Sequence, residues 1–245
     1  MSPGGLDVVA ELVAGVPEVV LAVYAHPDDA DVACGGTLAR WARHGASVHL
    51  VVCTDGGRGT PDPDVSPAQL ARRRAAELAA AAEKTGLASH RVLGAPDGEL
   101  DLRTTFVGEL VAIIRSLRPV AVLGHDPTAI FFGQEYFNHR DHRAAGWALL
   151  DALSPSAALP LYFPEAGPPH QASVAYLSGT LDPDVWVDIG ETIEIKAAAV
   201  ECHASQFSGA EPGWAAEAVR RRAEEEGRRA GVLHAEGFRR LRLSG

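Results

Sequence analysis

The sequence predicts an α/β fold in which a mostly parallel sheet is covered by helices on both faces. Over roughly the first 150 residues, short apolar runs rich in β-branched residues alternate with segments of helical character. Four of these runs end in turns that carry polar residues, as strands do at the ligand-binding edge of an open parallel sheet. The chain has 245 residues, 47% of them hydrophobic, and shows no linker or internal repeat, so we expect a single domain over 1–245.

Each expected strand is a short apolar run that stops at glycine, proline or a polar residue. The first four lie at 19–24, 47–53, 91–94 and 119–124, and three more are expected at 161–163, 173–176 and 185–189. The last two can pair differently from the first four, which would make the sheet mixed.

Helices are expected where apolar residues recur at helical spacing or where capping residues stand. Ser66 begins a capping-box pattern with proline at the first helical position, and a helix follows to near Gly86. Asn138 is the expected N-cap of a helix that runs to about Leu153. The remaining helices are expected at 37–44, 104–117, 193–203 and 213–229, and an aromatic loop is expected at 128–137.

Composition and charge narrow the possible partners. The net charge of −10 argues against nucleic acid or an anionic membrane as the main partner, since both need a basic face. The three cysteines lack CxxC spacing and indicate a reducing compartment rather than a disulfide framework or a thiolate zinc site. Residues 1–15 do not have the pattern of a signal peptide, and no apolar run approaches the roughly 20 residues that span a bilayer. We therefore expect a soluble, cytoplasmic protein, whose acidic surface and aromatic loop allow a homo-oligomer.

The polar stretch His26-Pro27-Asp28-Asp29 directly follows the first expected strand. A histidine and carboxylates at such a strand end can bind a divalent metal and handle a proton. The structural alternative is a polar turn in which Asp29 or Asp31 caps the next helix. The turns after the other three strands carry Asp55 and Arg58, then Asp97, then His125 and Asp126. Because parallel strands end at one edge of the sheet, these groups are expected to converge.

A second group of candidates stands at the start of the helix that follows residue 138. His139 and His142 are three residues apart and share one face of that helix, and Asp141 lies between them. Two histidines and a carboxylate form a hydrolytic zinc arrangement with a position left for water, although Fe²⁺ or Co²⁺ suits the same ligands. A further carboxylate then takes a proton from the water, and a further histidine stabilises the oxyanion or protonates the leaving amine.

Together these motifs resemble the LmbE-like, or PIG-L, family of zinc-dependent N-deacetylases. The matching motifs occur in the family's order at 26–29 with 35–37, at 54–59, 93–98 and 139–144, and at 196 with 203–206. The resemblance implies a Rossmann-like sheet and removal of an acetyl or other acyl group from an N-acyl amino sugar. The expected substrate is an N-acetylglucosamine-type conjugate, which metal-bound water would attack.

The resemblance also implies a role for each motif residue. His26, Asp29 and His142 would bind one Zn²⁺ ion per chain. The catalytic residues would be Asp28 as general base, His139 as the group that stabilises or protonates the tetrahedral intermediate, and Asp141 as the residue that orients a histidine.

Substrate contacts are implied for Arg58, Asp97 and His203. Each has a structural alternative: a turn-stabilising ion pair for Arg58, a loop cap for Asp97, and packing of the last helix for His203. The chain departs from the family's pattern at Arg140, where proline is usual, and in the long aromatic segment 128–138. That segment can stack on a sugar ring or line an acyl pocket, or it can be a lid or subunit contact.

Two other functions compete with a simple deacetylase. A mycothiol-conjugate-type amidase would use the same residues on a larger amide. A nucleotide-binding module would use 54–59 as a phosphate loop, but these glycines lack the GxGxxG and GxxxxGK[ST] spacings. An inactive sugar-binding relative is disfavoured because every expected ligand and the base are present.

Overall fold

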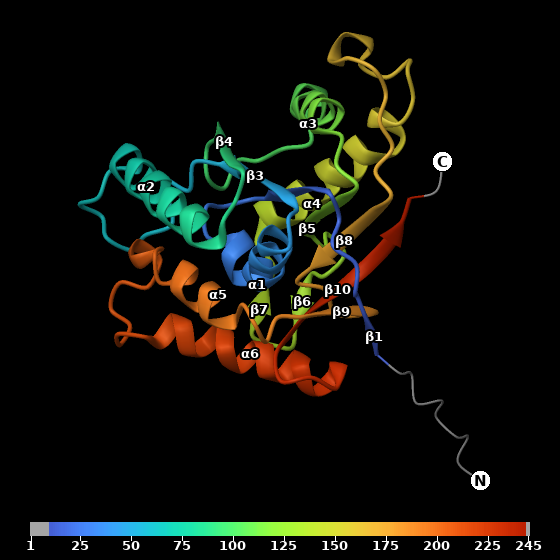
Figure 1. Ribbon diagram of the computed structural model, residues 1–245. Coiled ribbons are helices and arrows are strands. Elements are labelled where there is room, and N and C mark those ends of the chain that lie inside the picture. Colours follow the sequence, from blue (N-terminus) through green and yellow to red (C-terminus); the bar gives the residue numbers. More distant parts are fainter. Residues whose placement is uncertain (1–9, 244–245) are drawn as a thin grey trace.

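The computed structural model describes residues 10–243, and these residues form an eight-stranded sheet flanked by helices (Figure 1). Its strands are β1 (Glu11–Leu12), β2 (Val19–Tyr24), β3 (Ser47–Thr54), β4 (Ser89–Ala95), β5 (Ala121–His125), β8 (Val174–Ser178), β9 (Val185–Asp188) and β10 (Ala235–Arg242). Across the sheet they follow the order β1-β9-β10-β8-β5-β2-β3-β4. Neighbours are parallel except where β10 pairs with β8 and with β9. The predicted α/β fold with a mostly parallel, mixed sheet is confirmed, although the antiparallel strand is β10, which was not predicted.

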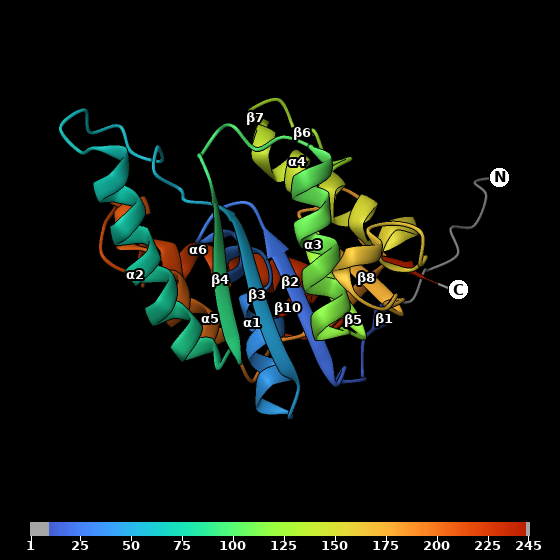
Figure 2. The ribbon, with the colours of Figure 1, turned by 90° about the horizontal axis from the view of Figure 1, so that it is seen from above.

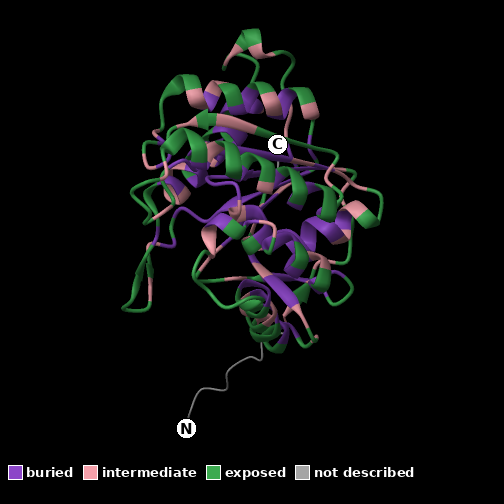
Figure 3. Ribbon diagram, turned by 90° about the vertical axis from the view of Figure 1, so that its left-hand side faces the viewer, coloured by how far each residue is buried: buried purple, intermediate pink, exposed green. Residues whose placement is uncertain are grey.

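Helices cover both faces of this sheet (Figure 2). One layer holds α1 (Asp29–Arg43), α2 (Pro67–Thr85), α5 (Ile193–Val200) and α6 (Trp214–Ala230), and the other holds α3 (Thr104–Leu117) and α4 (Arg140–Asp151). Alternate residues of β2 serve the two cores: Tyr24 packs in the cluster of Trp41 from α1, and Leu21 packs in the cluster of Leu149 from α4. Most buried residues therefore lie in the central strands, and most exposed residues lie on the outer helices and loops (Figure 3).

From β2, near the middle of the sheet, later strands extend the sheet in both directions. β3 and β4 extend one side, and β5 and β8 extend the other. Ligands of open α/β sheets bind beyond the carboxyl ends of the strands at such a reversal. His26, Asp28 and Asp29 follow β2, and His125 ends β5. The topology therefore brings two polar turns, about a hundred residues apart in sequence, to one point.

Helix α1 begins earlier than the expected residue 37, because two helical segments follow one another. Cys34 is non-helical, with φ −145° and ψ 19°, and separates them. The carboxylate of Glu236, on β10, accepts hydrogen bonds from the backbone N–H groups of Gly36 and Thr37 at 3.0 and 2.7 Å. A carboxylate at a helix N-terminus satisfies N–H groups that have no partner within the helix. The predicted start at the glycine pair thus matches the second segment only.

The strand expected at 161–163 is wrong, because this segment turns around a buried arginine. Arg115 of α3 is 3% exposed. It donates hydrogen bonds of 2.7 to 3.2 Å to the carbonyl oxygens of Ser156, Ala157, Leu159, Tyr162, Phe163 and Gly167. A buried guanidinium must have its N–H groups satisfied, so the chain curls to bring its carbonyl groups inward instead of extending.

Other local differences are smaller. The N-cap of α4 is His139 and not Asn138. The aromatic loop contains a two-stranded hairpin, β6 (Phe131–Phe132) and β7 (Tyr136–Phe137). The helix expected over 193–203 ends at Val200. The predictions for a single domain over 1–245 and for residues 1–15 extend beyond the described residues. Within residues 10–243 we find no helix with the length and apolar character to cross a membrane.

Candidate metal and catalytic site

Three histidines surround one carboxylate where β2 and β5 end. Asp29 Oδ2 lies 3.3 Å from His26 Nδ1 and 3.2 Å from His125 Nε2, and Asp29 Oδ1 lies 3.2 Å from His142 Nε2. His26 Nδ1 and His142 Nε2 are 3.2 Å apart. The three predicted metal ligands, His26, Asp29 and His142, are thus in contact pairwise. Their nitrogen and oxygen donors are of the kinds that zinc binds in hydrolytic sites.

The two ring nitrogens of His26 face different partners. Nδ1 faces Asp29 and His142, whereas Nε2 lies 3.2 Å from Asp97 Oδ1 and 3.4 Å from Asp141 Oδ2. An ionised carboxylate can only accept, so the hydrogen belongs on Nε2, which leaves Nδ1 as a possible metal ligand. Burial acts to lower the pKa of His26, but the carboxylates of Asp29, Asp141 and Asp97 outweigh it and raise this pKa to about 12. The surroundings of Nδ1 therefore favour a positive charge, which a proton or a metal ion can supply.

His142 is oriented by Asn138 in a similar way. His142 Nδ1 lies 3.0 Å from Asn138 Oδ1, and Asn138 Nδ2 donates to the carbonyl oxygen of Ala129 at 2.7 Å. The second bond fixes which end of the amide faces the ring, so His142 Nδ1 donates its hydrogen to an oxygen. His142 Nε2, which faces Asp29, then keeps its lone pair. Metal-binding histidines are commonly held in this manner through their other nitrogen.

Asn138→Ala is expected to weaken zinc binding by about 10- to 100-fold, because His142 loses the acceptor that orients it. The affinity can be measured by competition with a chromophoric chelator. Asn138→Asp keeps an oxygen toward His142 but loses the hydrogen bond to Ala129, and it should retain more of the affinity than Asn138→Ala. An unchanged affinity in Asn138→Ala would show that His142 needs no such orientation or does not bind the metal.

The raised pKa of His26 also predicts how the stability of metal-free protein depends on pH. A folded-state pKa of about 12 against an ordinary value of 6.5 gives a stabilisation that is complete below pH 6.5 and declines as the pH rises above it. Chelator-treated protein should therefore show a falling melting temperature between about pH 6.5 and 9. His26→Gln should show a flatter profile over the same range. Parallel profiles for the two proteins would contradict the charged state assigned to His26.

Asp28, the predicted general base, lies on the pocket surface next to this cluster. Its Oδ1 accepts a hydrogen bond of 2.5 Å from Arg74 Nη2, and Arg74 Nη1 donates to the carbonyl oxygen of Gly56 at 3.0 Å. The Arg74 side chain is 3% exposed. A Cβ atom at Gly56 would lie 2.6 Å from Arg74 Nη1, and one at Gly59 would lie 2.8 Å from it. The glycine-rich turn therefore wraps around the guanidinium that holds Asp28, which accounts for Gly56 and Gly59 without a bound phosphate.

His139 is the N-cap of α4 and Asp141 lies in its first turn, and they have different tasks. His139 Nδ1 accepts a hydrogen bond from the backbone N–H of Asp141 at 3.1 Å, so the neutral ring carries its hydrogen on Nε2. Burial and the charge of His26 lower the pKa of His139. Asp141 is fully buried and accepts from the backbone N–H groups of Gly98 and Leu100 at 2.6 and 3.2 Å. Asp141 thus ties the loop after β4 to the histidine cluster.

The three residues predicted to contact the substrate lie in different surroundings. Asp97 lies at the cluster; burial acts to raise its pKa, but the contact with His26 outweighs this and lowers the pKa to about 2. Arg58 Nη2 forms an ion pair with Glu99 at 2.7 Å, as in the turn-stabilising alternative. His203 is fully buried, with Nε2 2.8 Å from Asp31 Oδ2, so it does not reach the pocket surface. The same contact corrects Asp31, which pairs with His203 instead of capping a helix.

Sequence reasoning placed His125 in a converging turn but gave it no role. Its ring stacks on that of His142, with centroids 4.2 Å apart and an interplanar angle of 8°. His125 Nε2 also accepts from the backbone N–H of Ala25 at 3.2 Å. Burial lowers the pKa of His125 to about 4, so the ring is neutral at physiological pH. These contacts are consistent with a neutral His125 ring that packs against the ring of His142 and fixes its position. Asp29, His125 and His142 also form a second possible metal-binding group.

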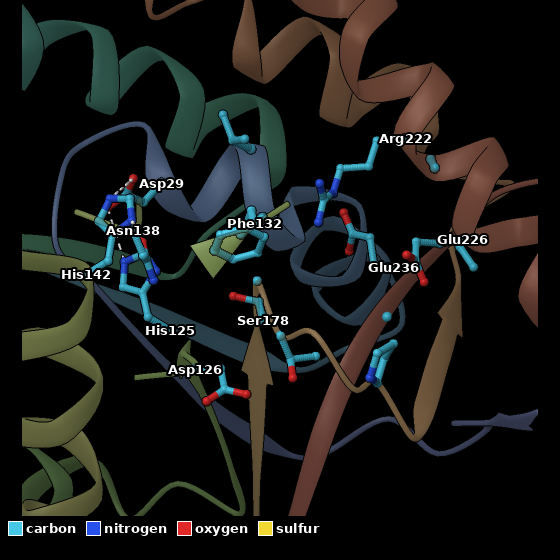
Figure 4. Close-up of a pocket in the computed structure, with 18 of the residues that line it drawn as sticks. Asp29, His125, Asp126, Phe132, Asn138, His142, Ser178, Arg222, Glu226 and Glu236 are labelled. Atoms are coloured by element: carbon cyan, nitrogen blue, oxygen red, sulfur yellow. Dashed lines mark hydrogen bonds and ion pairs between the residues drawn. The ribbon is translucent and has the colours of Figure 1, made fainter. Parts of the chain in front are cut away.

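A pocket of about 390 Å³ opens beside the cluster. Asp29 and His142 line one end (Figure 4), and Asp28, which precedes Asp29 in the chain, also lines the pocket. The possible metal ligands thus lie close to Asp28, a carboxylate with one oxygen held by Arg74, and to His139, whose Nε2–H points away from its backbone contact. Such a set can polarise a carbonyl group, take a proton from water and donate a hydrogen bond or proton to a leaving group.

Several known proteins are similar to this chain in both sequence and fold. A model of the PIG-L family, described as GlcNAc-PI de-N-acetylase, matches residues 21–153. The diacetylchitobiose deacetylase of Thermococcus kodakarensis is 36% identical over 192 residues, which cover 77% of this chain and 70% of that protein. A 1D-myo-inositol 2-acetamido-2-deoxy-alpha-D-glucopyranoside deacetylase of Streptomyces avermitilis is 34% identical over 185 residues, 64% of this chain and 60% of that protein.

Among solved structures, the N,N′-diacetylchitobiose deacetylase from Pyrococcus horikoshii, in complex with its inhibitor MPG, superimposes with a TM-score of 0.84. The two proteins are 30% identical, and the match covers 92% of this chain and 84% of that one. The family match spans β2 to α4, and so it includes His26, Asp28, Asp29, His139 and His142. The resemblance inferred from the motifs is confirmed, and the chain belongs to the PIG-L family.

Proposed function

We propose that this protein is a zinc-dependent amidohydrolase that removes an acetyl or other acyl group from an N-acyl amino sugar. The observation that carries the proposal is the position of Asp28, which lies beside the contacting trio of His26, Asp29 and His142 at the reversal point of the sheet. The relatives named above are deacetylases of N-acetylated amino-sugar compounds, which supports this substrate class.

His26, Asp29 and His142 would hold the metal ion. Two imidazoles and a carboxylate suit Zn²⁺, and Fe²⁺ or Co²⁺ share this preference. When bound, the ion supplies a Lewis acid for the amide carbonyl and lowers the pKa of a water molecule toward about 7. Asp141 is a less suitable ligand, because backbone N–H groups already occupy both of its oxygens.

The remaining steps belong to side chains of this chain. Arg74 holds Asp28 Oδ1 in place, so Asp28 Oδ2 is the oxygen that accepts the proton from the attacking water. His139 donates a hydrogen bond from Nε2 to the oxyanion, since its Nδ1 accepts from the backbone and the neutral ring has no second proton to give. Asp28 passes the proton that it took from the water to the leaving nitrogen. Collapse of the tetrahedral intermediate then yields a carboxylate and a free amine. Asp97 and Asp141 keep His26 in the tautomer that binds metal.

A mycothiol-conjugate-type amidase is the second candidate, because it would use the same groups on a larger amide. The cytoplasmic location, the possible homo-oligomer and the lack of a nucleic-acid partner stay predictions from composition.

The proposal is tested by measuring primary-amine release from N-acetylglucosamine, N,N′-diacetylchitobiose and a thiol conjugate of an amino sugar. The metal-loaded protein should release amine from the first two compounds, lose this activity with a chelator and regain it with zinc. Preference for the thiol conjugate would favour the amidase. Absence of amine release from all three by zinc-loaded protein would overturn the proposed function.

A further inference from the structure

A short turn that follows α5, residues 203–206, lies behind the catalytic site and contacts several elements that surround Asp28. We call it the 203–206 turn; α5, which leads into it, packs against α2 (Figure 1). The turn lies outside residues 21–153, which the family model matches. Three of its side chains form hydrogen bonds to three different parts of the fold.

Ser205 is bound to the helix that carries Arg74. Glu77 lies on α2, three residues after Arg74. Its Oε1 accepts a hydrogen bond from the backbone N–H of Ser205 at 2.9 Å, and its Oε2 accepts one from the Ser205 hydroxyl group at 2.6 Å. Ser205 is buried, and both bonds go to a charged acceptor, which makes them stronger than bonds between neutral groups. The 203–206 turn therefore fixes the part of α2 from which Arg74 reaches Asp28.

Gln206 contacts the glycine-rich turn that wraps around Arg74. Its Nε2 donates to the carbonyl oxygen of Gly59 at 3.3 Å and lies 3.0 Å from the Ser205 hydroxyl oxygen. A Cβ atom at Gly59 would lie 2.8 Å from Arg74 Nη1 and 3.0 Å from Gln206 Oε1, so Gly59 lies between these two side chains. The guanidinium of Arg74 is thus enclosed by a turn that Gln206 holds from outside.

His203 binds the start of α1. Its Nε2 lies 2.8 Å from Oδ2 of Asp31, and both residues are buried. Asp31 lies in the first turn of α1, whose N-cap residue is Asp28. The 203–206 turn is therefore bound to the helix that begins at Asp28 as well as to the groups around Arg74.

The Asp28 side chain has few contacts of its own. It makes no capping hydrogen bond to α1. Within residues 10–243, the side chain that hydrogen-bonds to its carboxylate is Arg74 alone. The position of the carboxylate consequently depends on where Arg74 and the start of α1 are held.

We infer that the 203–206 turn is a positioning element for the general base Asp28 and acts on it through Arg74. The inference rests on the proposed function, in which Asp28 Oδ2 accepts the proton from water. A general base must lie within hydrogen-bond reach of the proton that it takes. A displacement of about 1 Å at a reacting group can slow a reaction about 100-fold, so a distant contact that fixes Asp28 affects the rate.

The test measures kcat and KM for N,N′-diacetylchitobiose with zinc-loaded full-length protein. Ser205→Ala removes the hydroxyl bond to Glu77 and should lower kcat about tenfold, with KM and zinc content unchanged, because the lost precision is felt in the transition state. Gln206→Ala, at a half-buried position, should lower kcat about threefold without affecting folding. Thr85→Val is the matched control: Thr85 is a buried hydroxyl residue at the end of α2 that donates only within its own helix. It should keep the wild-type kcat even if its melting temperature falls.

A double variant separates positioning of Asp28 from a general loosening of the fold. If Ser205 acts through Asp28, adding Ser205→Ala to Asp28→Asn should change kcat less than about twofold, since the base is already absent. Gln206→Ala can replace Ser205→Ala in this comparison if the latter does not fold.

Three results would overturn the positioning role while leaving the deacetylase function in place. The turn variants could keep the wild-type kcat, their loss could be equal with and without Asp28, or Thr85→Val could lose as much. A wild type that releases no amine from any of the N-acylated compounds named above would overturn the proposed function itself.

Discussion

Asp28→Asn is expected to lower kcat by about 10²- to 10⁴-fold while zinc stays bound at the wild-type stoichiometry. The amide keeps an oxygen for the hydrogen bond from Arg74, so the turn stays in place, but it cannot accept the proton from water. Steady-state amine release and metal analysis of the same sample check both parts of this prediction. Asparagine is a better choice than alanine, because alanine would leave the buried Arg74 guanidinium without its carboxylate and would destabilise the fold.

Asp126→Asn is a useful control for Asp28→Asn, since it changes another carboxylate of the same pocket. Asp126 Oδ1 accepts from the backbone N–H and the hydroxyl group of Thr128, which an amide oxygen can also do. We expect this variant to keep most of the activity. If Asp28→Asn retained more than about a tenth of the wild-type kcat, the proton would be taken by another group.

Asp29→Ala and His142→Ala are expected to lose zinc and activity together. Each removes one of the three proposed ligands, and the two that remain cannot hold the ion through dialysis. Zinc content after dialysis, followed by kcat with and without added zinc, measures the effect. His125→Gln separates the two possible ligand sets that share Asp29 and His142, because His125 can complete one of them and His26 the other. We expect His125→Gln to retain zinc and His26→Gln to lose it; the reverse pattern would assign the metal to Asp29, His125 and His142.

Local patterns in the sequence were enough to predict most of the elements. The helix at 104–117 and the start of α2 at Pro67 have the predicted bounds, because apolar spacing and capping residues act within one or two turns. β10 was missed because its sequence, Ala-Glu-Gly-Phe-Arg-Arg-Leu-Arg, is rich in charge and contains glycine. It is a strand because β8 and β9 flank it, and pairing on both sides outweighs its low β-propensity.

For the site, the sequence by itself determined the fold class, the family motifs and the convergence of His26, Asp29 and His142. Their placement follows from strand ends and one helix start, which are local features combined by a general rule of parallel sheets. Only the tertiary structure decided which side chains hydrogen-bond to the motif residues and fix their positions. Arg74 reaches Asp28 across 46 positions, and Glu236 reaches the backbone of Gly36 across 200. Burial and hydrogen-bonding partners at such separations arise from packing, which no local pattern of residues records.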